Sequence, residues 1–230
     1  MPTGRTYILN EKKNVMERYR KISFWATICV ALFIVNFAFC ILCMNKTIYE
    51  KCLEQDVPSE NVQLENFERK ANFDKLSEDF KAFFKGKYEL VGYELDKHNT
   101  DRLNHIKWRY RRAWLVSIAC LAGMVYCFVV LSKRRMFMPF VYGSALSVFF
   151  TAVNALLFLR SDREFFSAAR DMVFRGNYGY FSDGDILLQI IPTDYARWMA
   201  ISYLMFVVVL AILMIIVRWF IMFLGRPHKF

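Results

Sequence analysis

Three consecutive basic residues, Lys133, Arg134 and Arg135, separate two apolar stretches that are each long enough to cross a lipid bilayer. About 20 apolar residues in a helix span roughly 30 Å of hydrocarbon, and residues 113–132 and 136–159 both reach this length. Because so short a segment joins them, the two helices must form an antiparallel hairpin. Cations in a short loop favour the cytoplasmic or matrix side, so the basic triplet predicts an orientation as well as a hairpin.

Two further apolar stretches, at residues 22–44 and 198–225, complete a set of four. Each must be helical, because lipid offers no partner to backbone polar groups, and the alternating segments of a membrane barrel do not occur in the sequence. We predict an all-α integral membrane protein with four transmembrane helices and amphipathic helices in the two larger loops. The remaining segments are an N-terminal tail (1–21), a first connector (45–112), a second connector (160–197) and a C-terminal tail (226–230).

Charge predicts that both termini lie on the same side as the basic triplet. The formal net charge is +10, and the basic excess falls in the two tails and the triplet, while the two connectors are nearly neutral. We therefore expect an N-in/C-in topology. Lys and Arg next to the spans carry the most weight, and on that count Arg109, Arg111 and Arg112 favour the reverse.

The connectors favour an intracellular membrane, mitochondrial inner or endoplasmic reticulum, over the plasma membrane. Cys52 is the only cysteine in either connector, so no disulfide can form between connector cysteines. The only glycosylation sequon begins at Asn45, directly against the first span.

Phenylalanines recur at helical spacing in the first connector and predict an amphipathic helix that ends before Gly86. Among them, Phe73, Phe80 and Phe83 must be buried against the rest of the connector, the bilayer interface or another subunit. A second helix is expected to start near residues 99–101 and to continue into the second span. In the second connector, residues 161–175 predict a further amphipathic helix.

Residues 108–114 interleave cations with aromatic side chains at a membrane boundary. Interfacial aromatic residues with arginines paired to lipid phosphates account for this pattern, and docking to an acidic partner or to a lipid such as cardiolipin is the alternative. No fold typical of nucleic-acid binding surrounds the segment. We predict a surface for partner or lipid docking that consists of Trp108, Arg109, Tyr110, Arg111, Arg112, Trp114, Phe73, Phe80 and Phe83.

Small or weakly polar residues form a stripe on three of the predicted spans. Such stripes let membrane helices approach closely and form hydrogen bonds, so we predict that they pack inside the bundle. The alternative is that the stripe of the third span lines a polar permeation path. The stripes contain Asn36 and Cys40, then Ser117 and Cys120, then Ser144, Ser147, Thr151 and Asn154.

The sequence contains no recognisable catalytic or metal-binding pattern. Within the apolar stretches Arg218 is the only charged residue, whereas proton relays and ion-coupled transporters need such groups. Serine-hydrolase, metalloprotease and phosphate-loop motifs are missing from the sequence. His98, Asp101 and His105 could share a helical face, but we expect them to be ordinary loop residues. We expect no metal and no cofactor.

These observations predict a non-enzymatic, multi-pass membrane protein that acts as an accessory, scaffolding or assembly subunit of a larger membrane complex. Its partners would be other membrane subunits and anionic phospholipids. The alternative is a small channel or carrier lined by the stripe of the third span. A lipid-modifying enzyme would need a catalytic constellation that the sequence does not display.

Overall fold

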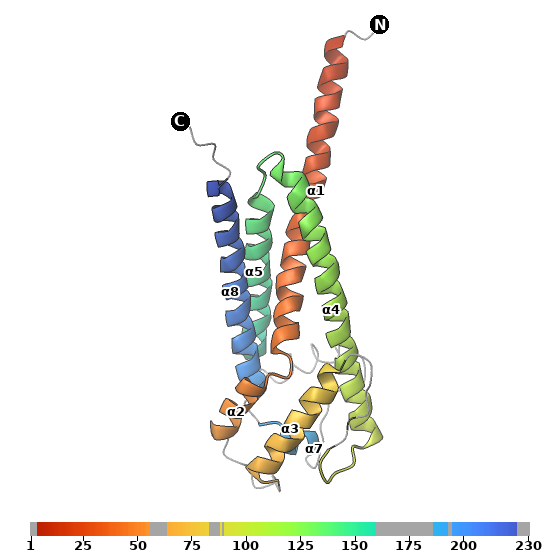
Figure 1. Cartoon of the computed structure of the whole chain (residues 1–230), viewed down its shortest axis with the longest axis vertical. Helices are drawn as coiled ribbons and strands as arrows, with labels where there is room; N and C mark the ends of the chain where they lie inside the picture. Colours follow the sequence, from red (N-terminus) through yellow and green to blue (C-terminus); the bar gives the residue numbers. More distant parts are fainter. Residues whose placement is uncertain are drawn as a thin grey trace. The chain divides into compact units, whose positions relative to one another are not determined.

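The computed structural model describes residues 4–55, 64–82, 88, 90–159, 186–192 and 195–224 (Figure 1). All regular secondary structure within these ranges is helical. The amphipathic helix expected at residues 161–175 lies outside the described residues, as does Phe83. The helices are α1 (Gly4–Leu42), α2 (Lys46–Gln55), α3 (Asn66–Lys81), α4 (Lys97–Ser132), α5 (Met138–Leu159), α7 (Ile186–Ile190) and α8 (Tyr195–Leu224).

Four of the described helices, α1, α4, α5 and α8, are long and apolar enough to cross a membrane. The chain is therefore an all-α integral membrane protein with four transmembrane helices. The spans expected near residues 113 and 198 are parts of longer helices, since α4 begins at Lys97 and α8 at Tyr195. The continuous α4 therefore joins the first connector to the second span without a break.

The basic triplet closes the hairpin between α4 and α5. The backbone N–H groups of Arg134 and Met136 both donate to the carbonyl of Leu131, at 3.1 Å each. Arg135 adopts the left-handed conformation with φ of 56°, which any residue other than glycine adopts at some cost. The turn thus satisfies the last carbonyls of α4 and reverses the chain within three residues.

The chain forms two compact units. The first, residues 1–38, 114–151 and 205–230, contains most of the membrane-spanning helices. Here α5 lies close to α1, because a Cβ atom on Gly143 would come within 2.7 Å of the Thr27 carbonyl oxygen. Ser144 and Ser147 are fully buried and donate to backbone carbonyls of their own helix.

The second unit, residues 39–113 and 152–204, has an aromatic core that joins the two connectors. The rings of Tyr49 and Phe73 stack with centroids 3.7 Å apart, and the ring of Tyr195 meets both of them edge-on. The Tyr49 hydroxyl donates to the carbonyl oxygen of Ile190 at 2.8 Å. The buried cluster consists of Tyr49, Cys52, Leu53, Leu64, Phe73, Leu90, Ile190 and Tyr195.

Candidate functional site

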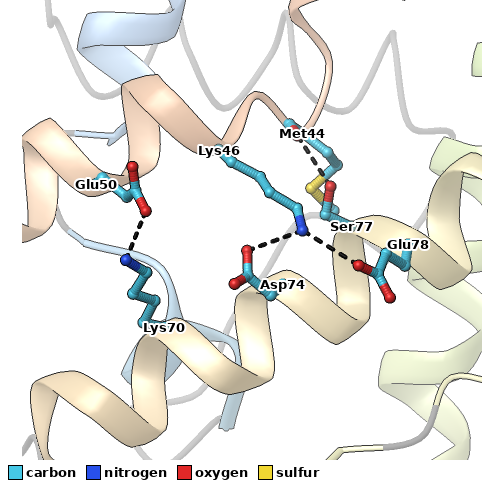
Figure 2. A network of polar contacts seen from close by, with 7 residues as sticks. All are labelled: Met44, Lys46, Glu50, Lys70, Asp74, Ser77 and Glu78. Atoms are coloured by element: carbon cyan, nitrogen blue, oxygen red, sulfur yellow. Dashed lines mark hydrogen bonds and ion pairs between the residues drawn. The ribbon is translucent and has the colours of Figure 1, made fainter.

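Exposed ion pairs hold α2 against α3 (Figure 2). The ammonium of Lys46 lies 3.1 Å from Asp74 and 3.3 Å from Glu78, and that of Lys70 lies 2.6 Å from Glu50. The hydrogen bond to Asp74 raises the pKa of Lys46, and the hydrogen bond to Glu50 raises the pKa of Lys70.

A backbone contact strengthens the same junction, because the Ser77 hydroxyl donates to the carbonyl of Met44 at 3.0 Å (Figure 2). Met44 has a positive φ of 55° at the turn between α1 and α2. The side chain of Asn45 then caps α2 by accepting from the N–H of Ile48 at 3.1 Å. These contacts fix α3, which in turn supports the beginning of α4.

One face of α4 is anchored on α3. The ring of Tyr110 lies 5.3 Å from that of Phe80, between centroids, and the ammonium of Lys107 donates to the carbonyl oxygen of Asp79 at 2.6 Å. Phe80, Lys107 and Tyr110 are all buried. Lys107, Tyr110 and Arg111 lie three and four residues apart and so share one side of the helix; we call this side the anchored face.

Tyr88, which precedes α4 in the chain, packs against the anchored face. The ammonium of Lys107 lies 5.5 Å from the centroid of the Tyr88 ring, within cation–π range. The Tyr88 hydroxyl is buried and has no hydrogen-bond partner among the described residues. Burial raises the pKa of Tyr88 to about 12, although the nearby charge of Arg111 opposes the shift. The phenol is therefore neutral at physiological pH.

The opposite side of the same helix carries a different set of residues. His105, Trp108, Arg109 and Arg112 follow one another at helical spacing, and we call this side the open face. Trp108 is 52% exposed, and the guanidinium of Arg112 lies 4.3 Å from its ring centroid. His105 is only half-buried, but its Nε2 atom is shielded from solvent.

The structure thus divides the docking surface that the sequence predicts. Trp108, Arg109 and Arg112 share the open face, whereas Tyr110 and Arg111 belong to the anchored face. Trp114 packs in the other unit, edge-on to the ring of Phe37. Phe73 and Phe80 are fully buried within the second unit, so neither offers surface to a partner.

The intramembrane stripes are divided in a similar way. Cys40, Ser117, Cys120, Ser144, Ser147 and Thr151 are all buried. Asn36 donates to the carbonyl of Leu32 on its own helix at 2.8 Å, and Asn154 is exposed. Ser144 and Ser147 direct their hydroxyls at their own backbone, so they do not line an open polar path.

A family model described as "Lipoprotein intramolecular transacylase Lit" matches residues 24–196, which is most of the chain. The chain therefore belongs to this family. No curated protein matches the chain at a significant level.

Solved structures of the membrane-integral lipoprotein intramolecular transacylase Lit from Bacillus cereus have the same fold. One is 17% identical with a TM-score of 0.77, over 90% of this chain and 96% of that chain. A second, in which a histidine is replaced by arginine, is 18% identical with a TM-score of 0.78, over 96% of this chain and 97% of that one. A third has alanine at that histidine and is 17% identical with a TM-score of 0.78, over 92% and 97% of the two chains.

Family membership overturns the function that we predict from the sequence. The predictions of a non-enzymatic accessory subunit of a complex and of a channel or carrier are both wrong, because the family is one of acyl-transferring enzymes. The mitochondrial preference is wrong as well, since the solved relatives come from a bacterium, and the preference for an organelle membrane loses its support. A multi-pass location in the membrane remains correct.

His105, which we interpret above as an ordinary loop residue, lies within α4, one turn before Trp108 and Arg109.

Proposed function

We propose that this protein is an intramolecular transacylase that moves an acyl chain from one group of a membrane-anchored lipoprotein to another group of the same molecule. The observation that carries the proposal is the match of the transacylase family to residues 24–196. The fold it shares with the Bacillus cereus enzyme supports it.

His105 is the residue that we assign to proton transfer. The solved relatives include two with a single histidine replaced, which singles out that residue type. This chain has three histidines, and the family match contains His98 and His105 but not His228. The side chain of His98 and all of His228 lie outside the described residues. His105 has a partly buried imidazole on the open face of α4, and on this observation we assign the role to His105.

The chemistry needs few groups from the protein. The acceptor group of the lipoprotein attacks its own acyl carbonyl carbon, and His105 takes the proton that this group loses. When the tetrahedral intermediate collapses, the bond to the original leaving group breaks and His105 returns the proton to it. Because donor and acceptor belong to one molecule, direct transfer requires no nucleophilic side chain. This is consistent with the lack of a nucleophile motif in the sequence.

The arginines of the open face have a second role in this proposal. Arg109 lies one turn beyond His105 on the same face, where a cation stabilises the oxyanion of the intermediate. Arg112, stacked on Trp108, lies where an interfacial pair contacts lipid phosphates. Together they would hold the substrate with its acyl carbonyl next to the imidazole, at the level of the headgroups.

The test is a product assay with a synthetic acylated lipopeptide in liposomes that contain the purified protein. An intramolecular transfer conserves mass, so tandem mass spectrometry should show an isomer whose acyl chain has moved. Replacing His105 by alanine should lower the rate about 10²- to 10⁴-fold, as expected for loss of a general acid–base group. His98→Ala, at the other histidine within the family match, should retain activity, and loss of activity in that variant alone would assign the role to His98 instead. An inactive wild-type protein would reject the proposed function, and full activity of His105→Ala would reject the role of His105.

The proposal also includes the N-in/C-in topology, which places the first connector outside the cell and the basic triplet inside. A cysteine introduced at the exposed Lys51 should then react with an impermeant thiol reagent in intact cells. A cysteine at the exposed Lys133 should react only after permeabilisation. The reverse pattern would invert the topology.

A further inference from the structure

A second site lies within the first unit, next to the basic triplet. A cavity of about 230 Å³ opens among α4, α5 and α8 and the turn after the triplet. Apart from Arg218 its lining is apolar, with Met124 and Phe128 from α4, Phe137 and Phe140 around the beginning of α5, and Met214 from α8.

Arg218 lies in this cavity, and its one hydrogen-bond acceptor among the described residues is weak. One terminal nitrogen of its guanidinium, Nη2, donates to the thioether sulfur of Met138 at 3.2 Å, and sulfur is a weak acceptor. The Nε atom is buried and has no hydrogen-bond partner among the described residues. No Asp or Glu occurs in the apolar stretches that form the spans. A cation in such a place is costly unless an anion pairs with it.

More positive charge surrounds the same place. Met138, which contacts Arg218, follows the basic triplet by three residues, and Figure 1 shows the end of α8 beside the beginning of α5. All three residues of the triplet are exposed. The guanidinium of Arg134 lies 5.4 Å from the ring centroid of Tyr19, so it is held over α1 at this end of the unit.

We propose that this cavity binds one anionic diacyl phospholipid. The phosphate would pair with the Nε edge of Arg218, the exposed triplet would favour a negative headgroup, and one acyl chain would occupy the apolar cavity. The planar guanidinium matches a phosphate with two parallel hydrogen bonds. The site shares no residue with the proposed transacylase site, and we propose the bound lipid as a resident ligand and not as the acyl donor.

The experiment measures lipid binding to the delipidated, full-length protein in detergent by native mass spectrometry. The probes are phosphatidylglycerol and phosphatidylcholine with identical acyl chains, and inorganic phosphate as competitor. The wild-type protein should retain one phosphatidylglycerol in preference to phosphatidylcholine, and inorganic phosphate should not displace it. Replacing Arg218 by glutamine should weaken phosphatidylglycerol binding about tenfold or more, since charged hydrogen bonds are lost.

Two further variants test whether the binding depends on Arg218 in particular and on the apolar part of the cavity. Arg197→Gln removes an exposed cation from the beginning of the same helix and should leave the binding unchanged. Val217→Trp, at a residue that lines the cavity, should weaken the binding of both lipids and preserve the preference between them. This second variant tests the site even if Arg218→Gln does not fold.

Equal retention of the two lipids by the wild-type protein would overturn the proposal, because it would indicate a non-specific annulus. Unchanged binding by a folded Arg218→Gln protein would overturn it too. Displacement by inorganic phosphate would show that the acyl chain contributes nothing and would reject the cavity as its binding site. None of these measurements depends on transacylation, so the proposed function can fail or hold independently.

Discussion

The two faces of α4 in the first connector differ in burial: the anchored face is packed against α3, and the open face is more exposed. On the anchored face, Lys107 is 2% exposed and Tyr110 is 7% exposed, and each has a defined partner on α3. On the open face, Trp108 is 52% exposed, and the guanidinium of Arg112 lies over its ring. Residues of similar chemistry, cations and aromatics, therefore have different surroundings according to the side of the helix on which they lie.

The difference teaches that composition alone does not identify a binding surface. A buried cation whose ammonium meets a backbone carbonyl is part of the scaffold. A cation on an exposed aromatic ring, such as Arg112 on Trp108, belongs to the surface that we propose for the substrate. Replacing a buried cation of the anchored face should lower stability, and replacing an exposed cation of the open face should lower activity.

The largest effect on stability is expected when Phe80, which packs against Tyr110 of the anchored face, is replaced. Replacing this fully buried ring by alanine should reduce the free energy of unfolding by about 3–5 kcal/mol. Denaturant or thermal unfolding of the protein in detergent measures this change. Phe67→Ala is the matched control, because Phe67 lies on the same helix and is 67% exposed. Equal losses in the two variants would show that the aromatic contact with Tyr110 does not anchor α4.

Replacing one cation on each face, Lys107 and Arg112, should distinguish the two faces by their effects on stability and activity. Lys107→Met leaves the carbonyl of Asp79 without its donor and should cost about 1–3 kcal/mol of stability, with activity falling only as the protein unfolds. Arg112→Met should change stability by less than about 0.5 kcal/mol, yet it should raise the KM for the lipopeptide substrate. Unfolding curves and initial rates measured on both proteins test this. The reverse assignment of effects would refute the division into two faces.

Much of the fold could be predicted because lipid imposes simple rules. Four long apolar stretches had to become helices, and the spacing of Phe73 and Phe80 predicted the buried side of α3. Periodicity could not say what would cover that side. Its partners, Tyr49 and Tyr195, come from distant parts of the chain, and no local pattern connects them. For this reason the sequence left the rest of the connector, the bilayer interface and another subunit as candidates. The docking role expected for Phe73 and Phe80 has no exposed surface to support it.

The function could not be predicted for a chemical reason. Our search asked for a nucleophile with its base, or for a metal, because most group transfers leave that signature. A reaction in which donor and acceptor belong to one substrate needs little more than a proton carrier and a cation. A single histidine such as His105 is indistinguishable in sequence from a histidine with no role, so the absence of motifs was wrongly read as the absence of catalysis.

Tyr88 offers a smaller test of the anchored face through pH. Its pKa is raised to about 12 by burial, above the value of about 10 that an unfolded tyrosine has. As the pH rises above about 10, the unfolded state loses the proton first, so the stability that burial provides declines through the interval up to the folded pKa. Tyr88→Phe should flatten this alkaline decline, as followed by unfolding at pH 8 to 11. Tyr93→Phe, at a 43% exposed position, should leave it as in the wild type. If the stability of Tyr88→Phe declined at alkaline pH as that of the wild type does, the phenol of Tyr88 would not be buried against α4.

The smallest effect belongs to the ion pairs between α2 and α3, which support the anchored face only indirectly. Lys46 and its two partners are substantially exposed, and exposed ion pairs contribute about 0–1 kcal/mol and weaken with salt. Lys46→Ala should therefore lower stability slightly at low ionic strength, and the difference from wild type should shrink as salt is added. Lys51→Ala, an exposed lysine on the same helix, should show no such salt dependence. A large loss in Lys46→Ala that salt does not reduce would mean that the packing of its alkyl chain, rather than its charge, holds α3 beneath α4.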